Sequence, residues 1–103
     1  MNTERIKLLE KFIAEDPDDA FSRYALALEL SNDDPNKAVT ILLALIKDNP
    51  QYVPTYYQVG LLLLDQNRLE EAKIILEQGI KTARLQNEHK AATELKQLFE
   101  ELD

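Results

Sequence analysis

Apolar residues recur along the chain at intervals of three and four, which is the spacing of helices that bury one side. Polar breaks containing proline, asparagine or neighbouring acids interrupt this pattern at residues 16–19, 32–35, 49–50, 66–67 and 86–87. Between the breaks Ala, Leu, Glu, Lys and Gln dominate, and all of these residues favour helix. The pattern predicts an all-α fold of six helices.

Two of the breaks carry residues that are typical of helix starts. Asp34 precedes Pro35, which is the order of an N-cap followed by proline at the first helical position. Asn67 is followed three positions later by Glu70, which is the asparagine form of a capping box. We expect a helix to begin at each of these sites.

The segments resemble one another at an interval close to the distance in sequence from Asp16-Pro17 to Asn49-Pro50. The first halves compare as Phe21-x2-Tyr24-Ala25-x2-Leu28 with Tyr56-x2-Val59-Gly60-x2-Leu63. The second halves compare, at nearly the same interval, as Ala38-x3-Leu42-x2-Leu45-Ile46 with Ala72-x3-Leu76-x2-Gly79-Ile80. A repeat of about 34 residues indicates stacked helix pairs, each covering the apolar face of the next.

These residues resemble the tetratricopeptide repeat (TPR) family, whose helix-turn-helix unit has an aromatic residue, a Leu-Gly pair and later an alanine. The second repeat is the better match, with Gly79 where alanine is usual. The resemblance covers residues 9–83 and implies a right-handed helical solenoid. It divides the chain into an N-terminal half-repeat at 1–17, repeats at 18–50 and 51–84, and a C-terminal capping helix at 87–103.

The resemblance also implies a protein-binding scaffold, because first helices of TPR units line a concave docking surface. Tyr57, Leu61 and Leu64 form a second apolar stripe on the predicted helix 52–65. We expect a peptide or protein segment to dock there unless the C-terminal helix covers it. The alternative is that the same apolar face forms a homodimer. The candidate binding residues are Ser22, Arg23, Leu26, Glu29, Tyr57, Gln58, Leu61 and Leu64.

Composition and charge narrow the function further. The 103 residues are 45% hydrophobic, 30% charged and free of cysteine, which fits one modest folded core and no disulfide framework. We therefore expect a single domain over residues 1–103. The net charge is -7, without the clustered Lys and Arg that nucleic acid or an anionic membrane requires. With no secretory pattern or long apolar run, we expect a cytoplasmic protein.

Catalytic chemistry has few candidate residues. His89 is the one histidine, and no cysteine is present to complete a metal site or a nucleophilic pair. Gly60 and Gly79 fall inside predicted helices, so they cannot form a phosphate-binding loop. The acidic breaks lack the regular spacing and turn glycine of a calcium loop. We expect no enzyme, no cofactor and no metal ion.

Overall fold

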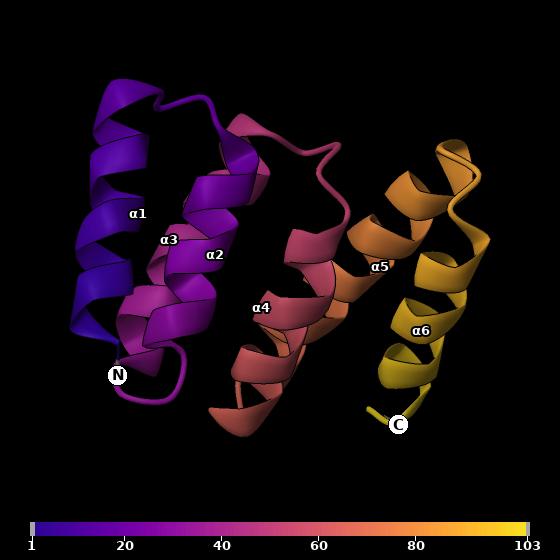
Figure 1. Cartoon of the computed structure of the whole chain (residues 1–103). Coiled ribbons are helices and arrows are strands. Elements are labelled where there is room, and N and C mark those ends of the chain that lie inside the picture. The colour runs from indigo at the N-terminus through magenta and orange to yellow at the C-terminus, as the bar shows by residue number, and fades with distance from the viewer. Residues whose placement is uncertain (1, 103) are drawn as a thin grey trace. The chain divides into compact units, whose positions relative to one another are not determined.

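The computed structural model describes residues 2–102, which form six helices in chain order (Figure 1). They are α1 (Thr3–Glu15), α2 (Ala20–Leu30), α3 (Pro35–Asp48), α4 (Pro54–Asp65), α5 (Leu69–Leu85) and α6 (His89–Glu100). No strand occurs within this part of the chain. The predicted all-α fold and the five predicted breaks are therefore confirmed.

The chain divides into two compact units, residues 1–49 and residues 50–103. In the first unit, α1 packs on α2 and α2 packs on α3. In the second unit, α4 packs on α5, and α6 packs mainly on α5 with a smaller contact to α4. Neighbouring helices within each unit run in opposite directions (Figure 1). The expectation of one domain over residues 1–103 stays a prediction.

The core of the first unit follows the predicted apolar stripes. Leu42 and Leu45 of α3 are fully buried, and Leu9 of α1 is the buried residue of its helix. Ala27 and Ala38 have no exposed surface, which lets the backbones of α2 and α3 approach closely. Small residues are therefore found where these two helices meet.

The core of the second unit is built around Tyr56. Its side chain is fully buried, and its hydroxyl donates a hydrogen bond to the carbonyl of Pro50. A Cβ added at Gly79 of α5 would lie 2.6 Å from the Tyr56 Cβ, so α5 can pass this ring only with glycine there. Gln86 Nε2 donates to the Gln51 carbonyl at 2.7 Å, which ties the end of α5 to the loop before α4.

A helix begins at both predicted sites, but only one of the two predicted N-caps is confirmed. Asp34 Oδ1 accepts a hydrogen bond from the Lys37 amide at 3.2 Å, and Pro35 begins α3. Asn67, however, ends α4 and does not cap α5, because its φ of 58° is left-handed. The Arg68 amide donates to the Leu63 carbonyl at 2.8 Å, as in a Schellman C-cap.

The break between α5 and α6 repeats this C-cap. Asn87 also has a φ of 58°, and the Glu88 amide donates to the Ala83 carbonyl at 2.8 Å. Asparagine is the residue other than glycine that most readily adopts this conformation. Gln66-Asn67 and Gln86-Asn87 therefore form C-caps of the same type.

Candidate functional site

The second apolar stripe of α4 retains part of its surface. Tyr57, Leu61 and Leu64 are each half-buried, as is Gln58 beside them. The opposite stripe, which includes Tyr56, Val59 and Leu63, is fully buried. Both stripes have a spacing of three and four residues. The stripe of Tyr57 is shifted by one residue from the stripe of Tyr56, so the two stripes face different sides of α4. The arrangement leaves an aromatic ring and two leucines able to contact another molecule.

The four candidate residues of α2 are placed differently. Ser22 is buried, and its hydroxyl donates to Asp19 Oδ2 at 2.6 Å. Leu26 is buried as well. Arg23 forms an ion pair with Asp48 at 2.9 Å, and Glu29 forms one with Arg5 at 2.6 Å. All four side chains are thus engaged in packing or pairing inside the first unit.

Burial corrects the alignment of the two repeats. Phe21 is 60% exposed and Leu28 is 38% exposed, whereas their sequence-matched partners Tyr56 and Leu63 are fully buried. Residues separated by the interval from Pro17 to Pro50 do agree in burial: Ser22 with Thr55, Leu26 with Val59, Ala27 with Gly60, and Leu30 with Leu63. The match of Phe21 with Tyr56 was therefore wrong by two positions.

The corrected alignment finds two residues that the sequence analysis missed. Tyr24 of α2 corresponds to Tyr57 of α4, and Leu28 corresponds to Leu61. Tyr24 is half-buried and Leu28 is more than one-third exposed, so both pairs retain surface. A Tyr-x3-Leu stripe therefore recurs at the same place on the two helices. The interval from Pro17 to Pro50 was a signal that could have found it.

The described residues offer little for catalysis or metal binding. Within residues 2–102, no three His, Asp or Glu side chains gather as a metal ion would require. His89 lies exposed in the first turn of α6. Among the helices of the described chain, none is long and apolar enough to cross a bilayer.

Among the ion pairs of the described residues, the pair of Arg68 and Glu71 shifts the pKa values of its own two groups. Arg68 Nε donates to Glu71 Oε1 at 2.9 Å, and Nη2 donates to Oε2 at 2.7 Å. These hydrogen bonds lower the pKa of the Glu71 carboxyl and raise the pKa of the Arg68 guanidinium. Both groups lie in solvent at the start of α5, where the pair supports the helix and forms no catalytic dyad.

Comparison with known proteins identifies the family. The family model for the tetratricopeptide repeat matches residues 19–52, which is the first repeat, although the residue pattern had favoured the second. A tetratricopeptide repeat domain protein from Salinibacter ruber, solved by NMR, is 36% identical with a TM-score of 0.80. The match covers 85% of this chain and 90% of that one.

A crystal structure of a tetratricopeptide repeat domain protein from Salinibacter ruber is also similar, at 35% identity and a TM-score of 0.77. That match covers 82% of this chain and 96% of the other. None of the curated proteins compared matches this chain. The chain belongs to the tetratricopeptide repeat family. Proteins with this fold generally act as protein-interaction scaffolds.

Proposed function

We propose that this chain is a non-catalytic scaffold that docks a protein or peptide segment on the Tyr-x3-Leu stripe that α2 and α4 each carry. The recurrence of this stripe at equivalent, partly exposed positions supports the proposal. A packed core requires one apolar stripe for each helix, and α4 buries such a stripe on its other side. The second stripe can therefore provide binding contacts.

Tyrosine suits the role of an anchor. Its ring supplies a large contact area with few rotatable bonds, and its hydroxyl can hydrogen-bond a backbone group of the ligand. Leu61 and Leu64 follow Tyr57 at the next turns, so the three side chains match an extended or helical apolar segment. Gln58 would supply a polar contact at the margin of such a ligand, whereas Arg23 and Glu29 already pair with Asp48 and Arg5.

The corrected alignment changes which α2 residues the proposal uses. Ser22 and Leu26 have little surface to offer, so we place Tyr24 and Leu28 at the centre of the α2 contact instead. The set of Lys, Asn and Arg that some TPR proteins use to hold a terminal carboxylate is missing from the matching α4 positions, which hold Tyr57, Gln58 and Leu61. An internal segment of the partner is therefore the better-suited ligand.

A peptide-display selection on the wild-type chain tests the proposal. Selected peptides should shift the amide NMR signals of α2 and α4, and Tyr57→Ala should weaken their binding roughly thirtyfold, as for a hot-spot residue worth about 2 kcal/mol. Tyr24→Ala should also weaken it. Ile74→Ala removes an exposed apolar side chain from α5 and should leave affinity unchanged.

The alternative function is self-assembly through the same face. It predicts a dimer that Leu61→Asp dissociates, with peptide binding and dimer formation excluding each other. Peptides whose signals map to other helices, with equal affinity for wild type and Tyr57→Ala, would contradict both readings. Circular dichroism of each variant separates loss of binding from loss of the fold.

A further inference from the structure

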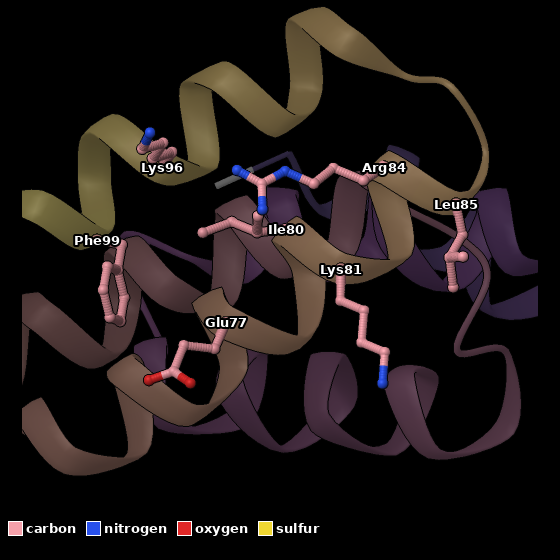
Figure 2. A pocket seen from close by; sticks show the side chains of 7 residues that line it. All are labelled: Glu77, Ile80, Lys81, Arg84, Leu85, Lys96 and Phe99. Carbon is pink, nitrogen blue, oxygen red and sulfur yellow. The ribbon is translucent and has the colours of Figure 1, made fainter.

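The second unit has a hollow of about 670 Å³ between the C-terminal half of α5 and α6 (Figure 2). Its apolar surface comes from Ile80 and Leu85 of α5 and Phe99 of α6. Leu85 is 77% exposed, which is unusual for a leucine near the end of a helix that packs on both of its neighbours. The hollow lies apart from the Tyr57 stripe, because no residue of α4 lines it.

Most of the charged residues that line this hollow are cations. Lys81, Arg84 and Lys96 line the hollow against a single acid, Glu77. Arg84 extends over Ile80 toward the side on which Lys96 lies (Figure 2). The described part of the chain provides an ion-pair partner for none of the three cations. In a protein of net charge -7, the hollow is a local site for an acidic and apolar ligand.

The first unit carries a surface of the opposite kind on α1. Leu8 is 48% exposed and Phe12 is 42% exposed, one turn apart and therefore on one side of the helix. Glu4 and Glu15 extend the same side at either end, and Lys11 lies at its edge. Residues 2–19 contain six acidic and three basic residues. The α1 surface thus offers two apolar side chains between carboxylates.

We infer that the α5–α6 hollow of one copy receives α1 of a second copy. Leu8 and Phe12 would contact Phe99 and the small exposed edge of Ile80, while Glu4 and Glu15 would face the cations of the hollow. The opposite charges and the matching apolar residues support this occupant over an unrelated acidic segment, because the chain itself supplies both halves. The inference does not rest on the proposed peptide-binding function.

The two surfaces differ, so the contact is heterologous and propagates from copy to copy as an open chain unless the rotation between copies closes a ring. A copy whose hollow is filled still presents its own α1. The average mass should therefore rise beyond that of a dimer as concentration increases. Because charge pairs contribute, association should weaken at high salt.

Sedimentation equilibrium of the full chain at about 10 μM to 1 mM, in about 50 and 500 mM NaCl, tests the inference. The α1 variant is Leu8→Ser with Phe12→Ser, and the hollow variant is Lys81→Glu with Arg84→Glu. We expect each variant to raise the apparent dissociation constant at least tenfold. An equimolar mixture should form a one-to-one pair and grow no further, because one intact α1 and one intact hollow remain.

Two controls match these substitutions. Leu69→Ser removes an exposed leucine at the opposite end of α5, and Lys37→Glu with Lys47→Glu reverses two charges on α3. Both should associate like the wild type. If the α1 variant loses helicity, Glu4→Lys with Glu15→Lys tests the same contact by charge alone and should restore pairing with the hollow variant.

Three results would overturn the inference. The wild type could remain a monomer at the highest concentration, a dimer could survive both double substitutions, or the mixture of the two variants could stay monomeric. Association lost on Leu61→Asp but unaffected by the α1 and hollow variants would assign self-assembly to the α4 stripe instead. A monomer that binds an unrelated acidic helical peptide in the hollow would also overturn it.

Discussion

Gly79→Ala tests whether glycine is required where α5 crosses Tyr56. In this family alanine is usual at the position, and alanine also favours helix. The added Cβ would lie 2.6 Å from the Tyr56 Cβ and 2.8 Å from its Cγ, closer than real side-chain contacts come. Both atoms adjoin the backbone of α4, and the hydroxyl of the same ring is bonded to Pro50. The ring therefore cannot move aside without moving α4.

Two opposed contributions determine how much Gly79→Ala changes the free energy of unfolding. Replacing glycine by alanine inside a helix gains about 1 kcal/mol. Overpacking a buried contact costs about 1 to 3 kcal/mol, and this contact belongs at the upper end because the Leu95 Cδ1 also lies 3.2 Å from the new methyl group. We expect a net loss of about 1 to 2 kcal/mol in the free energy of unfolding. For a chain of this size, that lowers the Tm by about 5 to 15 °C.

Gly60→Ala is the matched substitution. Its Cβ would meet the Leu76 Cδ2 at 2.7 Å, which is the far end of a flexible side chain that can rotate away. The overpacking cost should therefore be near the gain in helix propensity, leaving the stability within about 1 kcal/mol of the wild type. Urea and thermal unfolding by circular dichroism measure both. Gly79→Ala as stable as the wild type, or no worse than Gly60→Ala, would refute the reasoning.

Three further predictions concern individual polar residues. Thr55 is fully buried and its Oγ1 lacks a hydrogen-bond partner, so Thr55→Val should stabilise the chain by about 1 kcal/mol in urea unfolding; a loss of stability would indicate an undetected partner. Asn87→Ala should destabilise by about 1 kcal/mol and Asn87→Gly should not, because alanine resists the left-handed conformation; equal melting curves would contradict this. Glu71 has a lowered pKa, so the stability from its pair with Arg68 is complete above the ordinary carboxyl pKa and is lost as the pH falls through the lowered value. NMR titration should show the pKa of Glu71 rising in Arg68→Gln, and an unchanged titration would remove the assigned cause.

The helices were predictable because each break holds residues with strong local preferences. Pro35 starts a helix, and Asp34 before it accepts the orphan amide of Lys37. The Gln-Asn pairs also marked real ends, yet Asn67 was assigned to the wrong side of its break. Asparagine is favoured both as an N-cap and in the left-handed C-cap, so its identity alone could not decide between the two.

The partly exposed Tyr-x3-Leu stripe could be predicted from the sequence on α4 but not on α2. On α4, Tyr57, Leu61 and Leu64 were found because the two apolar stripes of one helix differ in phase. On α2, the alignment was anchored on the aromatic residue Phe21, which proves to be exposed. The choice of Ser22 and Leu26 followed from that anchor, so the error came from the repeat alignment and not from the helical periodicity.

The residues that fix the repeat alignment are the small ones that are buried between helices. Ala27 and Gly60 are equivalent in the corrected alignment, and both are buried where the two helices of a repeat meet. The position that Tyr56 fills in the second repeat is held in the first by Arg23, which pairs with Asp48. An aromatic ring and an ion-paired arginine can occupy equivalent positions because both have a long apolar stem and a polar end that finds a partner. Steric requirement is therefore a better guide than aromatic identity when divergent repeats are aligned, and it gives Tyr24 and Leu28 the same place in their repeat that Tyr57 and Leu61 have in theirs.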